Sequence, residues 1–383
     1  MNNRDAYIIL NILPDIGPLR VESLISFFGE PKAILNTPAA QLQRVQGIGA
    51  ATAKSISDWK EQCDLDEEKK RVEQAGVTLV TRDDDCYPPL LKEIHDPPLC
   101  LYVRGNPEIL KLTSSSIAMV GSRRTTNYGK KVADNLGTAA AAAEWPVVSG
   151  LARGIDTLVH EAVVRMGGCA IAVIGSGLGR IYPQENIGLA RQIAEKGVVV
   201  SEFPMHYAPA KRSFPMRNRI IAGMTRGTVV IEAGYRSGSL ITASQALDQN
   251  RQVFAVPGRV DSPQSKGCNK LIREGAYLAE TFRDVLEAFS FLPGFSPSEP
   301  IRSGDEKSSG ANGQSANKDL TLSELEGKLL SSIDNEEVQI DNLVASVNEP
   351  VPAVLQALFT LELKRVIRQL PGKRVVRIDN TQT

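Results

Sequence analysis

Short apolar runs alternate with helical stretches between residues 76 and 290, and this alternation constrains the fold more than any other feature. The apolar runs are rich in Val and Ile and lie at 77–80, 117–120, 147–149, 170–174, 198–201, 228–231 and 253–256. Helical patterns lie between most of them, at 129–143, 156–166, 185–196 and 240–249. Short strands that are apolar on both faces and separated by helices indicate a parallel sheet covered on both sides. We therefore predict an α/β fold with a Rossmann-like, doubly wound, mostly parallel sheet and a small preface at 76–105.

The chain has 383 residues, which leaves room for further domains on either side of this sheet. Residues 1–70 are helical in pattern and predict a small helical domain of the helix-hairpin-helix (SAM-like) type. Residues 291–319 are rich in Ser, Gly, Pro and Asn, which predicts a disordered linker. Residues 320–379 have the pattern of three amphipathic helices, a strand, a Pro-Gly turn and a strand. This order predicts a winged-helix-like domain.

The roles of the two terminal domains remain open at this point. Gly47 and Gly49 resemble the glycines of a helix-hairpin-helix turn, whose backbone amides face a DNA phosphate. The alternative is a helical packing domain without DNA contact, which the acidic neighbours Asp58, Glu61 and Asp64 favour. The third C-terminal helix offers few side chains that could read bases in a groove, so a protein-contact or regulatory role is an alternative to duplex binding.

Positive charge is concentrated in one segment of a chain that is neutral overall, with 44 basic and 44 acidic residues. Residues 203–231 contain no Asp or Glu, and the cations there are Lys211, Arg212, Arg217, Arg219 and Arg226. Cations gathered beside a strand of an α/β sheet suit a phosphate backbone. Phe214 interrupts the charges and offers a ring on which a base could stack. A solvated cationic face is the alternative, but Arg217, Asn218 and Arg219 run directly into apolar residues of a predicted helix.

The other candidate loops also follow strands, because ligands of doubly wound sheets bind beyond the carboxyl ends of the strands. Gly121, Ser122 and Arg123 follow the strand at 117–120, but the next glycine comes too late for a Walker A loop. A Ser/Arg turn at a helix start can still clamp a phosphate, and Arg123 is a stronger candidate than Arg124 because it lies nearer the strand. Ser237, Gly238 and Ser239 supply hydroxyl groups and backbone amides at another helix start.

Two further motifs each have two interpretations. The loop at 175–183 contains Gly-x-Gly-x-Gly, with Arg180 where the dinucleotide fingerprint requires its last glycine, so a flexible loop near the ligand is favoured over an NAD site. Asp156 and His160 lie four residues apart and share a helical face. They form either a general acid–base pair or a capping carboxylate with a packed histidine. The second interpretation is favoured, because no nucleophile accompanies the pair.

The cysteine pattern and the hydropathy indicate the compartment. Five cysteines without a Cys-x-x-Cys pair are typical of reduced thiols in a cytosolic protein. No apolar run approaches the ~18 residues of a membrane span, and the N-terminus has too short an apolar core for a signal peptide. We therefore expect a cytoplasmic protein without membrane contact. We predict no metal, cofactor or catalytic residue.

The motifs of the predicted sheet domain match one family in order. They are GSRRTTNYG, VVSGLARGIDTLVHEA, GSGLGRIYPQEN, SEFPM, FPMRNRIIAG, EAGYRSGSLITA and VPGRVDSPQSKGCNKLIREGA. This series resembles the DNA-processing protein A (DprA/Smf) family over residues 76–290. The resemblance implies a single-stranded DNA-binding protein that protects incoming DNA and loads the RecA recombinase during natural transformation. It also implies a homodimer and no catalytic reaction.

The resemblance and the residue patterns together define a candidate DNA site. The resemblance implies contacts at Gly121, Ser122, Arg123, Lys211, Phe214, Arg217 and Asn218. The charge and turn patterns add Arg219, Ser237, Gly238 and Ser239. The alternative is a small-molecule nucleotide-processing enzyme, a phosphoribohydrolase on a related Rossmann-like fold. That class uses a PGGxGTxxE turn, whereas this chain has Arg236 and serines in place of the second glutamate.

Overall fold

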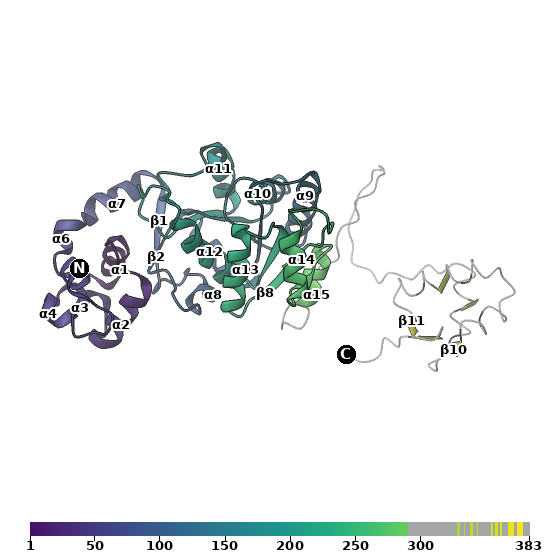
Figure 1. The fold of residues 1–383 in the computed structure, drawn as a ribbon, viewed down its shortest axis with the longest axis horizontal. Helices are drawn as coiled ribbons and strands as arrows, with labels where there is room; N and C mark the ends of the chain where they lie inside the picture. Colours follow the sequence, from purple (N-terminus) through teal and green to yellow (C-terminus); the bar gives the residue numbers. More distant parts are fainter. Residues whose placement is uncertain are drawn as a thin grey trace, which may run out of the picture. The chain divides into compact units, whose positions relative to one another are not determined.

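The computed structural model describes residues 1–289 and, toward the C-terminus, residues 328–329, 333, 338–339, 343, 354, 357–358, 361, 367–370 and 374–377 (Figure 1). Contacts divide the chain into two compact units, Met1–Ser303 and Gly304–Thr383. The predicted linker at 291–319 lies outside the described residues. The first unit therefore contains both the predicted helical domain and the predicted sheet domain.

A nine-stranded sheet forms the centre of the first unit, in the order β1-β2-β6-β5-β4-β3-β7-β8-β9. The strands are β1 (Val77–Thr81), β2 (Cys100–Gly105), β3 (Ile117–Gly121), β4 (Val147–Ser149), β5 (Ala170–Val173), β6 (Val198–Ser201), β7 (Gly227–Glu232), β8 (Gln252–Ala255) and β9 (Tyr277–Leu278). The pairs from β6 through β9 are parallel, whereas β2 pairs antiparallel with both β1 and β6. The prediction of a mostly parallel α/β sheet is confirmed.

Helices cover both faces of this sheet, as a doubly wound fold requires. Successive residues of β3 point to opposite faces, so Ile117 and Met119 lie in one core while Ala118 and Val120 lie in the other. The first core includes side chains of α9 (Asn127–Ala142), α10 (Ile155–Arg165), α11 (Ile187–Lys196) and α15 (Phe282–Ala288). The second includes side chains of α12 (Ser213–Gly223), α13 (Gly238–Asp248) and α14 (Lys266–Arg273) (Figure 1). Shorter helices are α8 (Pro89–Lys92) and the 3₁₀ helices η1 (Pro107–Ser115) and η2 (Gln184–Asn186).

The N-terminal helices build a core of their own and also pack onto the sheet. They are α1 (Asn3–Ile12), α2 (Pro18–Phe28), α3 (Pro31–Leu35), α4 (Ala39–Leu42), α5 (Ala50–Ser57), α6 (Trp59–Gln62) and α7 (Leu65–Gln74). Gly47 has a φ of +85°, a left-handed value that favours glycine, and Gly49 is the N-cap of α5. Ile8 of α1 and Val72 of α7 belong to the core beneath the sheet, and Asn11 Nδ2 donates to Glu202 O over 2.8 Å. These helices are therefore anchored to the sheet by shared apolar contacts and to the residue after β6 by a hydrogen bond from a side chain to the backbone.

The described residues of the second unit include a small antiparallel sheet in the order β10-β12-β11. Its strands are β10 (Val338–Gln339), β11 (Ile367–Leu370) and β12 (Arg374–Arg377). The two predicted strands are present, because β11 pairs antiparallel with β12, and the predicted Pro-Gly turn between them lies outside the described residues. Helical positions such as Leu329, Leu358 and Leu361 are buried together with Val375 of β12. This arrangement confirms a winged-helix-like domain.

Candidate functional site

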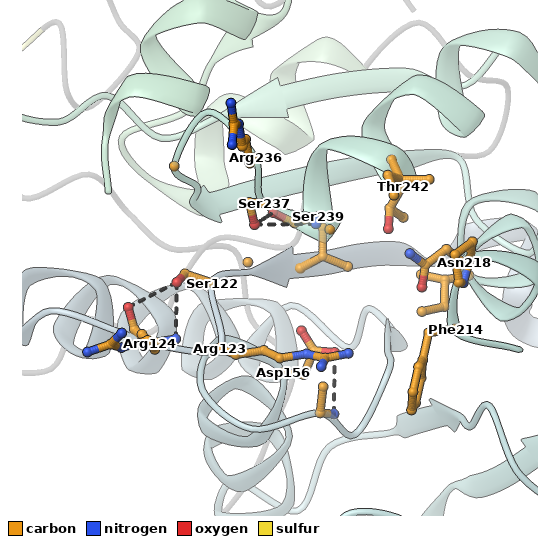
Figure 2. A pocket seen from close by; sticks show the side chains of 18 of the residues that line it. Ser122, Arg123, Arg124, Asp156, Phe214, Asn218, Arg236, Ser237, Ser239 and Thr242 are labelled. Carbon is orange, nitrogen blue, oxygen red and sulfur yellow. Dashed lines mark hydrogen bonds between the residues drawn. The ribbon is translucent and has the colours of Figure 1, made fainter. Parts of the chain in front are cut away.

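A pocket of about 850 Å³ opens at the carboxyl ends of β3 and β7 (Figure 2). The strand order places β4 on one side of β3 and β7 on the other. From β3 the chain adds β4, β5 and β6 toward one edge of the sheet, and it then adds β7, β8 and β9 toward the other edge. Such a switch point is where ligands bind in open α/β sheets. The polar and aromatic lining residues are Ser122, Arg123, Arg124, Asp156, Lys211, Phe214, Arg217, Asn218, Arg236, Ser237, Ser239, Thr242 and Gln264.

The turn between β3 and α9 forms one wall and is fixed by the end of β7. Ser122 N donates to Glu232 O over 2.7 Å. The Glu232 carboxylate accepts from Thr126 N at 3.0 Å and from Thr126 Oγ1 at 2.6 Å, at the start of α9. A carboxylate is favourable at a helix N-terminus, because the unpaired N–H groups there carry partial positive charge. The predicted residues Gly121, Ser122 and Arg123 are therefore held in place before any ligand arrives.

Arg123 and Phe214 meet across the pocket. The guanidinium carbon of Arg123 lies 5.1 Å from the centroid of the Phe214 ring, which is a cation–π contact. Phe214 is half-buried on α12, and its ring centroid lies 6.0 Å from that of the exposed Tyr182. The helix begins at Ser213, so Phe214 and Asn218 lie on a helix and only Lys211 remains in the loop before it. The predicted cation and the predicted stacking ring are thus brought together in one pocket.

Arg217 forms the floor of the pocket. It is 4% exposed, and its Nη1 donates to Val173 O at the end of β5. A Cβ at position 150 would lie 1.9 Å from Arg217 Nη1, so a side chain at that position would force the guanidinium to move from its place beside Val173 O. Burial lowers the pKa of Arg217 to about 10, while Asp156 opposes this shift. Arg217 therefore stays positively charged at neutral pH.

Asp156 and His160 do not form a hydrogen-bonded pair. Asp156 Oδ2 accepts from Gly150 N at 3.1 Å and from Ala152 N at 3.4 Å, so the carboxylate fixes the loop before α10. Burial raises the pKa of Asp156, and the nearby Arg217 works against this effect. His160 has no exposed surface, and burial lowers its pKa to about 3. A neutral, packed histidine beside a loop-fixing carboxylate fits the structural interpretation better than acid–base chemistry.

Ser237, Gly238 and Ser239 form the opposite wall, at the start of α13. Ser237 is the N-cap of this helix, and its Oγ lies 2.7 Å from Ser239 Oγ. Arg236 precedes them, and Thr242 follows one turn later; both line the pocket. Arg236, Arg124 and Thr242 were not among the residues predicted to contact a ligand. The sequence could have pointed to them, because all three lie in the motifs that resemble the DprA/Smf family.

Arg219 is the one predicted site residue that does not line this pocket. It is 6% exposed and pairs with the equally buried Glu202 carboxylate. Its Nε also lies 3.3 Å from Asp96 Oδ2. Both acidic partners come from outside α12, so Arg219 attaches this helix to the neighbouring segments. The structure thus gives Arg219 a supporting position behind the site.

The glycines of the loop at 175–183 serve close packing between two loops. Gly177 N donates to Tyr207 O and Gly179 N donates to Met205 O, each over 2.9 Å. A Cβ at position 177 would lie 2.0 Å from Pro204 O. These amides are already occupied by backbone carbonyl groups, so they are not available to a pyrophosphate. The interpretation as a dinucleotide site is therefore not supported. The alternative, a flexible loop near the ligand, also needs correction, because this loop packs tightly against residues 204–207.

Neither a metal cluster nor a membrane span is found in the described part of the chain. Within it, no group of three or more His, Cys, Asp or Glu side chains could hold a metal ion. No helix among the same residues is long and apolar enough to cross a membrane. The pocket itself contains cations, one carboxylate, hydroxyl groups and an aromatic ring.

Comparison with known proteins identifies the family. The family model for DNA recombination-mediator protein A matches residues 78–290, and the model for the DprA winged helix domain matches residues 314–373. Protein Smf of Escherichia coli (strain K12) is 38% identical over 302 residues, which cover 79% of this chain and 78% of that protein. These matches span both units, so they confirm the winged-helix assignment as well as the sheet domain.

Two solved structures have the same architecture. The X-ray structure of DNA processing protein A from Streptococcus pneumoniae superposes with a TM-score of 0.66 at 34% identity, covering 76% of this chain and 99% of that one. DNA processing protein A from Helicobacter pylori, studied for its single-stranded DNA binding mode, gives a TM-score of 0.50 at 26% identity, covering 56% of this chain and 95% of that one. With the family model matching more than half of its length, this chain belongs to the DNA-processing protein A (DprA/Smf) family.

Proposed function

We propose that this chain binds single-stranded DNA in the pocket at β3 and β7. One observation carries the proposal: among the described residues that line the pocket, there are five cations and an aromatic ring, and Asp156 is the only acid. The cations are Arg123, Arg124, Lys211, Arg217 and Arg236. The cations attract a phosphate backbone. The ring favours unpaired bases, because a base in a duplex can stack on it only after losing its stacking and pairing within the duplex, which costs free energy. The relative from Helicobacter pylori supports the same ligand.

The predicted site residues have distinct roles in this proposal. Arg123 and Lys211 contact phosphates, and the Gly238 amide and the Ser239 hydroxyl group approach further phosphate oxygens. The Ser122 amide already donates to Glu232 O, so Gly121 and Ser122 shape the turn that presents Arg123. Phe214 stacks on a base, Asn218 lies one helical turn further along α12, and Ser237 contributes its hydroxyl group. Arg217 adds positive charge from below, and Arg219 holds α12 in place.

The salt dependence of binding tests this site directly. Arg123→Ala and Lys211→Ala should each reduce the slope of log affinity against log salt for oligo-dT by about one, because each removes one phosphate contact. Phe214→Ala should cost about 1–3 kcal/mol of binding free energy with little change in slope, because stacking releases no counterions. Arg283→Ala, on α15, is the matched control for the loss of an exposed arginine. If all three pocket variants bound like the unchanged chain, the site would be wrong.

We further propose that the chain protects incoming strands and loads the RecA recombinase on them during natural transformation, as a cytoplasmic homodimer. The family membership supports this role, and β9 supports the dimer. This two-residue strand ends the nine-stranded sheet, and its Tyr277 and Leu278 are exposed. An exposed apolar edge strand is a template for pairing with another chain. The mass in solution tests the dimer, and the rate at which RecA coats single strands in the presence of this chain tests the loading.

The enzymatic alternative finds less support. In the phosphoribohydrolase-like reading, a carboxylate of the β7–α13 segment would grip the substrate. Glu232 is instead buried, and both of its oxygens accept hydrogen bonds from Thr126. We therefore propose a binding protein and no catalytic reaction. Release of free base from nucleoside monophosphates by the purified chain would overturn this part of the proposal.

A further inference from the structure

A second contact between an exposed aromatic ring and a cation lies beside the pocket. Tyr235 is 59% exposed, and Lys266 Nζ lies 5.9 Å from the centroid of its ring. Tyr235 stands between Gly234 and Arg236, which both line the pocket. Lys266 is the first residue of α14, just after Pro263 and Gln264, which line the pocket too. The pair therefore flanks the pocket without lining it.

Tyr235 and Phe214 lie on opposite sides of the pocket. Phe214 follows Ser213, whose Oγ donates to Gly175 O beyond β5. Tyr235 follows β7, which the strand order places on the other side of β3 from β5. Figure 2 shows Phe214 and Arg236, the neighbour of Tyr235, at opposite sides of the site. An aromatic ring with a nearby cation is thus present at each end of one polar groove.

The exposure of Tyr235 has no explanation in the packing of the chain. Among the described residues, no hydrogen bond holds its hydroxyl group, in contrast to the exposed Tyr128, whose Oη donates to Pro257 O over 2.7 Å. Tyr128 is thus fixed to the protein, whereas both the face and the hydroxyl group of Tyr235 are available to a ligand. An exposed ring with an adjacent ammonium group matches one unpaired base followed by one phosphate.

We propose that Tyr235 is a second base-stacking platform and that Lys266 contacts the phosphate next to the stacked base. A bound strand then crosses the carboxyl ends of the strands from Phe214, over β3 and β7, to Tyr235. The inference rests on the proposed single-stranded DNA binding and extends it by a second subsite. It also gives a role to Lys266, a cation that lies beside Tyr235 and outside the pocket that Arg236 lines.

The length dependence of binding separates the two platforms. The full chain and its variants are titrated with oligo-dT of about 4 to about 20 nucleotides, a range that brackets single-stranded binding sites. Tyr235→Ala should weaken binding of the long oligonucleotides about 5-fold or more and leave the shortest unchanged, because a short strand fills only the pocket. Phe214→Ala should weaken binding at every length. Phe27→Ala on α2 is the matched control, because Phe27 is also 59% exposed.

Two further variants test the chemistry. Tyr235→Trp should retain the affinity for long strands, and its fluorescence should be quenched when a base stacks on it. Lys266→Ala should lower the salt slope by about one for long oligonucleotides only. If Phe214→Ala weakens binding but Tyr235→Ala leaves the length dependence unchanged, the second platform is overturned while the pocket stands. If the unchanged chain does not bind single strands at all, the proposed function fails first.

Discussion

Arg217 and Arg219 lie two residues apart on α12, and both side chains are buried, yet their surroundings differ. Arg219 is neutralised by Glu202 and Asp96, so its charge is not available to a ligand. Arg217 donates to a backbone carbonyl and lies among pocket residues, where burial of the charge is compensated only in part by Asp156. A buried charge is screened less by salt than an exposed one. The contribution of Arg217 to DNA binding should therefore persist at salt concentrations that suppress the contribution of Lys211.

His160 should make the stability of the first unit depend on pH. Its pKa is about 3 in the folded chain, against an ordinary value of 6.5, because burial disfavours the charged ring. Between these values the unfolded chain binds a proton that the folded chain does not, so stability falls as the pH falls from 6.5 toward 3. The loss is at most about 1.4 kcal/mol per pH unit for one group. Urea unfolding of residues 1–290 from pH 7 to pH 4 measures it.

The variant His160→Leu is the control for this prediction. It should remove the additional slope while the remaining groups, including Asp156, titrate as before. Because the raised pKa of Asp156 acts in the opposite direction, the comparison must be made between slopes rather than between absolute stabilities. Equal slopes for the unchanged chain and the variant would contradict the assignment.

Charge and motif order in the sequence selected residues that folding brings together in one place. Every predicted site residue except Arg219 lines one pocket. Arg219 was misleading because its acidic partners lie outside the acid-free segment: Glu202 just precedes that segment, and Asp96 is distant in sequence. A run of cations shows where charge gathers along the chain. It does not show which charges are neutralised by residues that folding brings near.

At the scale of elements, Glu232 joins the two walls of the pocket. It ends β7, just before the turn that leads to α13, and its carboxylate holds Thr126 at the start of α9. A Cβ at position 129 would lie 2.4 Å from Glu232 Oε2, so the first turn of α9 fits closely around the carboxylate. Glu232 therefore fixes the segment from Ser122 to Thr126, through its backbone oxygen and its carboxylate, to the end of β7 that leads toward Ser237–Ser239.

Loss of this carboxylate should affect stability and binding together. Glu232→Ala leaves Thr126 N and Oγ1 without their acceptor at a partly buried position, which should lower the free energy of unfolding by about 0.5–1.5 kcal/mol for each hydrogen bond. It should also weaken oligo-dT binding, because the segment from Ser122 to Thr126 loses the carboxylate that fixes its far end, while Ser122 N keeps its bond to the backbone oxygen of position 232. Thermal unfolding and titration of the same sample measure both effects.

Glu185→Ala provides the matched control for that change. Glu185 forms an exposed pair with Arg153, and exposed ion pairs contribute little to stability. Its removal should leave unfolding and DNA binding close to those of the unchanged chain. The linkage through Glu232 is refuted if Glu232→Ala destabilises the fold yet binds DNA with unchanged affinity.

The strands that the sequence predicted share one physical property. β3, β5, β6 and β7 are buried along most of their length, so they are continuously apolar and easy to find. β9 has only two residues, and both are exposed, so neither length nor periodicity marks it. β2 lay within the predicted preface at 76–105, but nothing in its apolar sequence specifies that it pairs antiparallel with β6. Pairing partners depend on the topology of the whole sheet.

At the scale of the molecule, the N-terminal helices have a core of their own but also contact the sheet across the boundary predicted at residues 70–76. Ile8 of the predicted helical domain and Val72, which lies between the two predicted domains, pack in the same core as strand residues such as Val77 and Tyr102. The buried Glu68 of α7 accepts from Met205 N over 2.8 Å, which connects this helix to the loop before α12. The helical part therefore supports the sheet and the segment that carries the site.

Truncation should show this dependence. Residues 1–290 should bind oligo-dT as the full chain does, because the pocket and all its supports lie in the first unit. Residues 76–290 should be less stable, because removal of α1 and α7 exposes the apolar surface of β1 and β2, and each uncovered Val or Leu side chain costs about 1.5–3 kcal/mol. Unfolding and gel shifts with single-stranded and duplex oligomers at two salt concentrations compare the three chains. Weaker single-strand binding by residues 1–290 would assign part of the site to the C-terminal unit.

The close approach of Gly150 to Arg217 ties together two positions that lie 67 apart in the chain. A methyl group at position 150 would occupy the space that the guanidinium fills. A side chain there would push the guanidinium away from Val173 O and so shift a positive charge of the pocket, without any change to a residue that carries charge.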